Sequence, residues 1–329
     1  MLNLPNYIKS DDIVIEVNII GYKTEGESSV IFLRDGTEII WAGVIDSYNL
    51  NSKNITKEIL EQNGYGLENK KINFLSITHP DEDHTKNISD IFDNFVDKNT
   101  YILTSDFFDF DKENDIKNIE KIKNEFINIF KKITEDNVDK LFLNRTYGEP
   151  GLEHKFLCRG RQIDFKILSL LPTDAQIINK KINQTQSIHK NMYSLFIIIE
   201  IGMTQLIFAG DCENDSLRYI NYDEVPERID LLKIPHHGSK TSDNILEWEI
   251  RDKELGTGVC TTRIKCGTTS KEILEKYRNY FERVCLTGDV VPENNNSDFG
   301  VVKLLYGTKG NFVLKPELFG NAIHVEKIL

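Results

Sequence analysis

The sequence predicts an α/β protein in which two sheets pack together and helices lie outside them. The main observation is that β-branched apolar runs alternate with amphipathic helical segments, in two similar halves of the chain. A second observation is that three of the apolar runs are followed at once by histidines or aspartates. A chain of 329 residues is long enough to bury a large core.

The first half begins with strands. We expect them over residues 13–20, 29–34 and 38–45, and Asp35-Gly36 is a strong hairpin turn between the second and the third. Helical segments then alternate with apolar runs. These elements are a helix over 54–63, a strand over 72–77, a helix over 85–95 and a strand over 101–104.

Residues 111–140 differ in character from the rest of the chain. Apolar residues recur there at helical spacing among lysines, glutamates and asparagines. They are Ile116, Ile119, Ile122, Phe126, Ile129, Phe130 and Ile133. We expect one long amphipathic helix, or two with a short break, in a helical insertion at about 107–150 within a single domain of residues 1–329. The insertion would cover a sheet face of the same chain, form a lid, or bind a partner protein or a second copy.

The second half repeats the alternation of strands and helices. In order, the expected elements are strands over 163–170, 194–201 and 205–209, a helix over 213–222, a strand over 229–234, a strand–helix–strand unit over 259–286, and a closing hairpin of 301–306 with 311–314.

Composition narrows the class of partner. Lys and Arg number 40 against 52 Asp and Glu, and the resulting charge of −12 argues against non-specific binding along a nucleic acid backbone. A phosphodiester substrate is still compatible, because bound divalent cations reverse the charge locally. No apolar stretch approaches about 18 residues, and no signal peptide is recognisable. The five scattered cysteines lack CxxC spacing, so we expect reduced thiols in a cytoplasmic protein without membrane contact.

The segment directly after the strand at 72–77 concentrates possible metal ligands. Two imidazoles and two carboxylates fall within six residues, namely His79, Asp81, Asp83 and His84. The first two could bind one cation and the last two a second. Mixed nitrogen and oxygen donors without cysteine favour zinc, manganese or iron over calcium or magnesium. A helix N-cap would account for the aspartates alone but not for the histidines.

Two later clusters have the same placement after an apolar strand. Asp211 follows the strand at 205–209 and is suited to bridge two metals, although it could also cap a helix. His236 and His237 follow the strand at 229–234, and either could complete the second metal's ligands. Because strand ends can converge on one edge of a sheet pair, we expect all three clusters to form one site.

These motifs resemble the metallo-β-lactamase fold superfamily, in particular the soluble domain of ComEC-type DNA-uptake proteins. That group has His-Pro-Asp-x-Asp-His, matched at residues 79–84, and an apolar strand ending in Gly-Asp, matched at 208–211. Its Leu-Lys-x-Pro-His-His-Gly-Ser-x-x-Ser segment is matched at 232–242, and its Asn-x-x-Ser by Asn191 and Ser194. The resemblance implies a four-layer αββα sandwich of two mixed sheets with outer helices.

The chain also departs from this group, although the resemblance spans about residues 12–306. Residues 21–28 lack the usual Gly-Gln-Gly-Asp-like turn, and no glycine follows the first motif. No membrane channel region accompanies the domain, so a role in DNA uptake does not carry over. Asp81 stands where most of the superfamily has histidine, and this carboxylate makes manganese a competitor to zinc.

The resemblance also assigns roles to the site residues. Asp83 would ligate the second metal and orient the nucleophile, His237 would be a ligand, and His236 would be the acid or a neighbour of the ligands. Which of these two histidines is the metal ligand and which is the acid stays open. The third ligand of the first metal is also open, with His189 and Asn191 as nearby candidates and His154 as a remote one.

The function implied is that of a dinuclear hydrolase with two divalent cations, zinc or manganese, and a metal-bridged hydroxide as nucleophile. A phosphodiesterase or nuclease acting on a nucleic acid or nucleotide is expected first. The substrate contacts expected are Ser239, Lys240, Thr241 and Ser242, with Asn191 as a further candidate. The alternatives are a thioester, lactone or amide hydrolase of the same fold, and a catalytically weak effector or binding subunit that docks through residues 111–140.

Overall fold

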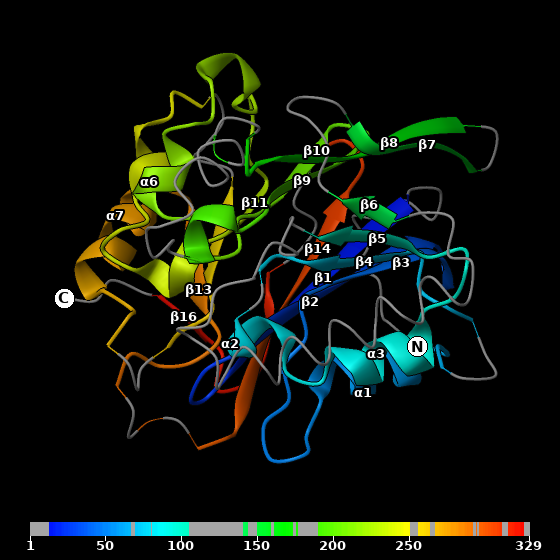
Figure 1. The fold of residues 1–329 in the computed structure, drawn as a ribbon, viewed down its shortest axis with the longest axis horizontal. Coiled ribbons are helices and arrows are strands. Elements are labelled where there is room, and N and C mark those ends of the chain that lie inside the picture. The colour runs from blue at the N-terminus through cyan, green and yellow to red at the C-terminus, as the bar shows by residue number, and fades with distance from the viewer. Residues whose placement is uncertain are drawn as a thin grey trace.

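The computed structural model describes residues 13–66, 70–79, 81–104, 141–143, 150–158, 161–173, 176, 190–250, 256–263, 267–291, 294, 296–310 and 315–325. Within these ranges the strands form two sheets of eight, and short helices lie around them (Figure 1).

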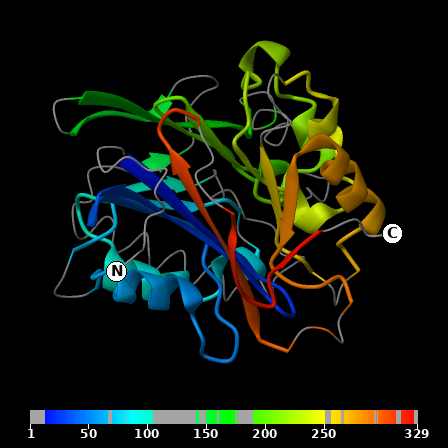
Figure 2. The ribbon, with the colours of Figure 1, turned by 180° about the vertical axis from the view of Figure 1, so that it is seen from behind.

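The first sheet has the strand order β15-β14-β1-β2-β3-β4-β5-β6. Its strands are β1 Ile13–Tyr22, β2 Glu27–Asp35, β3 Glu38–Ile45, β4 Phe74–Ile77, β5 Tyr101–Thr104, β6 Leu141–Leu143, β14 Phe299–Gly307 and β15 Glu317–Gly320. Seen from behind, β14 runs beside β1, with which it pairs in antiparallel register (Figure 2).

The second sheet has the order β16-β13-β12-β11-β10-β9-β8-β7. Its strands are β7 Pro150–Cys158, β8 Arg161–Leu171, β9 Phe196–Ile201, β10 Thr204–Phe208, β11 Leu231–Lys233, β12 Thr257–Cys260, β13 Arg283–Leu286 and β16 Ile323–His324. The helices are α1 Ile55–Gln62, α2 Glu82–Thr85, α3 Ile88–Phe95, α6 Asn214–Leu217 and α7 Lys271–Tyr280, with 3-10 turns η1 Lys190–Tyr193, η2 Tyr222–Glu224, η3 Pro235–Gly238 and η4 Asn244–Glu247.

The alternation of side chains along β1 explains how the core forms. Successive residues of a strand point to opposite faces of its sheet. Ile19 belongs to a buried cluster drawn from both sheets, which includes Ile197 and Ile199 of β9. The next residue, Ile20, belongs to another cluster together with Ile91 of α3. Strand β1 is therefore buried along its whole length, between the second sheet and a helical layer.

Helices also cover the outer face of the second sheet. Ile273 and Leu274 of α7 pack in one buried cluster with Ile198 of β9 and Ile207 of β10. The sheets thus face each other through one apolar cluster, and helices contact their outer faces (Figure 1). This arrangement confirms the predicted α/β class with two mixed sheets.

Each sheet contains a parallel part, and that part positions the candidate site. Strands β3 to β6 are parallel in the first sheet, and β10 to β13 are parallel in the second. The three predicted ligand clusters follow the carboxyl ends of β4, β10 and β11. Carboxyl ends of parallel strands are where α/β sheets usually bind their ligands.

Two expected helices are shorter than the apolar pattern predicts. The helix expected over 85–95 is interrupted at Asn87, whose φ of 64° is left-handed, so α2 and α3 are separate. The helix expected over 213–222 ends at Leu217. Beyond it the Tyr219 and Ile220 amides donate to residues three positions earlier, which is 3-10 rather than α-helical bonding.

Other expectations concern residues outside the described ranges. The helical prediction for 111–140 lies outside them, as does the second strand of the closing hairpin at 311–314. Of the predicted insertion at 107–150, the structure describes 141–143 and residue 150, which belong to strands β6 and β7. Neither strand was expected from the sequence. Among the described helices, none is long and apolar enough to cross a bilayer.

Candidate metal centre

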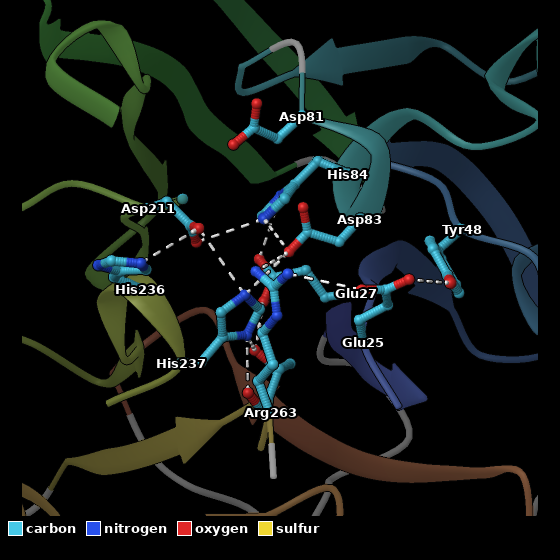
Figure 3. Close-up of polar contacts among 12 residues, drawn as sticks. Glu25, Glu27, Tyr48, Asp81, Asp83, His84, Asp211, His236, His237 and Arg263 are labelled. Carbon is cyan, nitrogen blue, oxygen red and sulfur yellow. Dashed lines mark hydrogen bonds and ion pairs between the residues drawn. The ribbon is translucent and has the colours of Figure 1, made fainter. Parts of the chain in front are cut away.

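Four buried side chains from both sheets meet beyond the strand ends, and we call them the inner donor set (Figure 3). They are Asp83, His84, Asp211 and His237, with side chains at most 6% exposed. The Nε2 of His84 lies 3.3 Å from Asp211 Oδ1, and the Nε2 of His237 lies 3.3 Å from Asp83 Oδ2. These distances bring nitrogen and oxygen donors around one point.

A second group, the outer donor set, shares Asp211 and adds His79 and Asp81. The Nε2 of His79 lies 3.7 Å from Asp211 Oδ2 and 3.8 Å from Asp81 Oδ2. The Asp81 side chain is 29% exposed, whereas His79 is buried. Asp211 connects the two sets, because its Oδ1 lies near His84 Nε2 and its Oδ2 lies 3.7 Å from the Nε2 atoms of both His79 and His237.

Several buried donor atoms of the two sets lack the hydrogen bonds that a metal-free site would need. His79 Nε2, His84 Nε2 and Asp211 Oδ1 are buried and have no hydrogen-bond partner among the described residues. A buried polar atom left in this state costs roughly 1–3 kcal/mol. A cation coordinated by these atoms would remove that cost. Three of the four inner donors, together with Glu27, offer ligand atoms within 4.8 Å of one another, so this buried group can hold a metal ion.

The other ring nitrogens of the inner histidines are held by oxygen acceptors. His84 Nδ1 donates to Asp46 Oδ2 at 2.8 Å, and Asp46 in turn accepts from the Thr78 amide and hydroxyl at 2.7 Å. His237 Nδ1 donates to the Thr261 carbonyl oxygen at 2.9 Å. These bonds hold each ring through Nδ1 and direct its Nε2 toward the carboxylates of the centre, which is how metal-binding histidines are oriented.

Glu27 lies behind these rings rather than among the Nε2 atoms. Its carboxylate is 3.5 Å from His84 Nδ1 and 3.4 Å from His237 Nδ1, and it forms a buried ion pair with Lys233. Burial raises the pKa of Glu27, but the Lys233 ammonium and the neighbouring His84 and His237 together bring it below its ordinary value. Lys233 Nζ also donates to the Gly210 carbonyl at 3.2 Å. Glu27 therefore lies against the Nδ1 atoms of both histidines, and it is also a possible ligand of the buried group.

The local charge favours a cation. Burial lowers the pKa of His84, but nearby carboxylates, led by that of Asp211, raise it well above its ordinary value. Burial lowers the pKa of His79, and the neighbouring His84 lowers it further, so the His79 ring is neutral. A neutral imidazole is the form that binds a metal. The centre thus combines a His79 ring whose pKa is lowered with carboxylates that favour positive charge at His84.

His236 and His237 differ in their surroundings, and this bears on which of them is a ligand. The Nδ1 of His236 pairs with Glu213 Oε1 at 3.0 Å, its Nε2 lies 4.0 Å from Asp211 Oδ2, and its side chain is 16% exposed. Asn191 donates to the same Glu213 oxygen at 3.1 Å. Burial lowers the pKa of His236, but the Glu213 carboxylate raises it above its ordinary value. His237 is thus the more buried of the two and contacts the inner set, whereas His236 pairs with Glu213 at the edge of the centre.

Backbone conformation fixes these loops. His236 and His237 have φ values of 45° and 53°, a left-handed region that non-glycine residues seldom adopt. Such conformations persist where the surrounding structure holds them, and they occur often at functional sites. Gly210, at φ 48°, is needed because a Cβ there would collide with the Ser194 hydroxyl. That hydroxyl accepts from the Asp211 amide at 2.9 Å and so sets the position of its carboxylate.

The predicted substrate residues divide into two kinds. Lys240 is exposed, and Ser239 lies at the edge of burial. Ser242 is buried, and its hydroxyl lies 3.1 Å and 2.8 Å from the carbonyl oxygens of Pro235 and Ser239. Ser242 thus holds the His-His loop together, and the predicted substrate contact does not fit its position. The side-chain amide of Asn191 donates to the Glu213 carboxylate, at the edge of the centre.

The candidates for the third ligand of the first metal are also separated by the structure. His154 is exposed on β7, at the edge of the second sheet, where its ring packs on Phe156. It is not part of the centre. His189 lies outside the described residues. Among the described residues, His236 Nε2 is the further imidazole nitrogen that approaches Asp211.

Sequence reasoning missed several residues of the centre. Asp46 follows β3 just as His79 follows β4, so the strand-end rule could have found it. Lys233 is a lone lysine in an apolar run, which signals a buried cation. Glu27 and Arg263, whose guanidinium donates to Asp83 Oδ2 at 2.9 Å, lie in segments with no distinguishing pattern.

No protein-family model matches the chain, and no curated protein matches it. Interpretation of the centre therefore depends on its own geometry and on the sequence motifs.

Proposed function

We propose that the protein is a dinuclear metal-dependent hydrolase of the metallo-β-lactamase fold, with the four-layer αββα arrangement, and that it cleaves phosphodiesters. The observation that carries this proposal is the pair of donor sets joined by Asp211, with buried and otherwise unpartnered donor atoms on His79 and His84. Mixed imidazole and carboxylate donors are suited to zinc or manganese.

The donor sets would hold one cation each. His79, Asp81 and Asp211 would hold the first, and the inner set would hold the second. When bound, the cations would supply Lewis acidity and a hydroxide nucleophile near neutral pH.

The chain's own groups would manage the protons. Asp83 would ligate the inner cation and orient the attacking water. His236, ion-paired with Glu213 and partly exposed, would protonate the leaving oxygen. Thr261 and Asp46 would keep the two inner histidines in the tautomer that directs Nε2 into the centre.

The proposal is tested by elemental analysis together with a phosphodiester panel. The panel contains bis(p-nitrophenyl) phosphate, single-stranded DNA, duplex DNA, RNA and cyclic dinucleotides. We expect close to two equivalents of zinc or manganese per chain and cleavage of at least one substrate, lost in His84→Ala. Full metal occupancy with turnover of thioesters only would refute the phosphodiester assignment and leave the metal centre intact.

A further inference from the structure

We infer that Arg263 binds the anionic group of the substrate beside the inner donor set, and that Glu25 occupies its guanidinium in the absence of substrate. The inference rests on the proposed function, and it adds the residue that selects a phosphate-bearing substrate.

The backbone of Arg263 is fixed relative to the metal centre. Arg263 lies three positions after the end of β12, and its backbone amide donates to the Thr269 hydroxyl at 2.9 Å. Two residues earlier, the Thr261 carbonyl accepts the Nδ1 proton of His237. The same short segment thus orients an inner-set histidine and starts the arginine side chain.

The guanidinium lies directly against the inner set. Arg263 Nη1 donates to Asp83 Oδ2 at 2.9 Å, and that oxygen is also 3.3 Å from His237 Nε2. The Arg263 side chain is 23% exposed, whereas the Asp83 side chain is 6% exposed. The guanidinium therefore reaches from the buried donors toward solvent, where a substrate can meet it.

The Glu25 carboxylate already lies beside this guanidinium, between it and Tyr48 (Figure 3). Glu25, in the loop between β1 and β2, has its Oε2 at 3.5 Å from Arg263 Nη2 and its Oε1 at 3.3 Å from the Tyr48 hydroxyl. Both contacts are long, and the Glu25 side chain is 37% exposed. Exposed pairs of this kind are weak, so an incoming anion can displace Glu25.

The chemistry of the displacing group follows from the donors. A guanidinium presents paired N–H groups that match two oxygens of a phosphate or phosphodiester. Lys240, the cation predicted from sequence, has no such contact with the inner set among the described residues. Arg263 is thus the better-placed anion receptor, with Nη1 on Asp83 and Nη2 in a long contact with Glu25 that a substrate anion can replace.

The test uses the metal-loaded full chain and three variants, Arg263→Gln, Arg263→Lys and Glu25→Gln. Metal content, kcat and KM for bis(p-nitrophenyl) phosphate, and the Kd of inorganic phosphate by calorimetry are measured for each. Arg283→Gln is the matched control, because Arg283 pairs with Glu282 at the start of β13, at the opposite end of the strand from the site.

We expect Arg263→Gln to raise KM and the phosphate Kd about 10- to 100-fold with metal content kept, the range for a lost hydrogen bond to a charged group. Arg263→Lys should recover part of this loss. Glu25→Gln should lower both constants about two- to fivefold, because the competing carboxylate is gone. Arg283→Gln should change neither.

Two results would overturn the inference. One is an Arg263→Gln protein with lowered kcat or metal content but unchanged KM and phosphate Kd, which would make the arginine a structural partner of Asp83. The other is a Glu25→Gln protein that binds phosphate no more tightly, which decides the matter even where Arg263→Gln does not fold. If the wild type cleaves no phosphodiester, the proposed function fails, and the phosphate Kd still decides the role of Arg263.

Discussion

The inner and outer donor sets share Asp211 but differ in how firmly the fold holds their other members. In the inner set, His84 and His237 are each fixed through Nδ1, by Asp46 and Thr261, and both lie over the Glu27 carboxylate. In the outer set, Asp81 is partly exposed at the start of α2. Among the described residues, the hydrogen-bonding neighbours of His79 Nδ1 are the hydroxyls of Thr78 and Ser194, at 3.2 Å and 3.5 Å.

Because of this difference, the two cations would not be bound equally. Ligands oriented by further hydrogen bonds bind metals more tightly, and their supporting groups typically contribute 10- to 100-fold in affinity. We therefore expect a tight inner cation and a weaker, more exchangeable outer one. The following variants test whether the two donor sets differ in this way.

Asp211→Asn should have the largest effect, because it removes the carboxylate that both sets use. We expect metal content below one equivalent and activity lower by about a hundredfold or more. Elemental analysis and phosphodiester turnover check this result. Asp215→Asn is the control, since Asp215 is exposed and pairs with Arg218 on the surface. Two retained equivalents in Asp211→Asn would show that this carboxylate does not join the sets.

His236→Gln should lower turnover while both cations remain, if His236 is the acid rather than an outer ligand. General acids contribute about 100- to 10,000-fold when the leaving group is an alkoxide. The loss should therefore be large on a dinucleotide and small on bis(p-nitrophenyl) phosphate, whose leaving group needs no proton. Equal losses on the two substrates, with one metal equivalent missing, would instead place His236 in the outer set.

Asp46→Asn should weaken the inner cation selectively. The isosteric amide no longer accepts the His84 Nδ1 proton with a charged oxygen, so we expect about 10- to 100-fold lower affinity at the inner set. The outer cation should be little affected. Calorimetric titration with zinc or manganese measures both, and circular dichroism checks that the fold is kept. A uniform loss at both sets would contradict a local role for Asp46.

Asp81→Asn should have the smallest effect and act on the other set. Because Asp81 is partly exposed and not part of the inner set, we expect roughly tenfold weaker binding of the outer cation and an unchanged inner one. The same titration reports this outcome. A loss of the inner cation in this variant would mean that the sets are not separable.

Much of this centre follows from local pattern, and the remainder depends on long-range packing. The apolar runs before His79, Asp211 and His237 identify buried strands, and parallel strands bring their carboxyl ends together, so the convergence of these candidate ligands was predictable. Glu27 and Arg263 reach the centre from loops and strand starts elsewhere in the chain. Their approach depends on how the two sheets pack, which no short stretch of sequence encodes.

The predicted lengths of two helices were wrong, because local spacing does not determine where a helix ends. The apolar spacing over 213–222 is helical, but Asn214 is bonded to the loop that follows the His-His turn, with its amide donating to the Thr241 carbonyl. That bond fixes the start of α6, and beyond Leu217 the amides of Tyr219 and Ile220 bond three residues back, so the segment continues in 3-10 turns rather than as an α-helix. Propensity and periodicity describe a segment by itself, and tertiary packing overrides them near a site.

The most direct test of two unequal donor sets is a calorimetric titration of metal-depleted full-length chain with zinc or manganese. We predict two binding steps of one equivalent each. The tighter step should be lost in His84→Ala, and the weaker step should be altered in Asp81→Asn. A single step, or no binding, would contradict the proposal that Asp211 joins two cation sites.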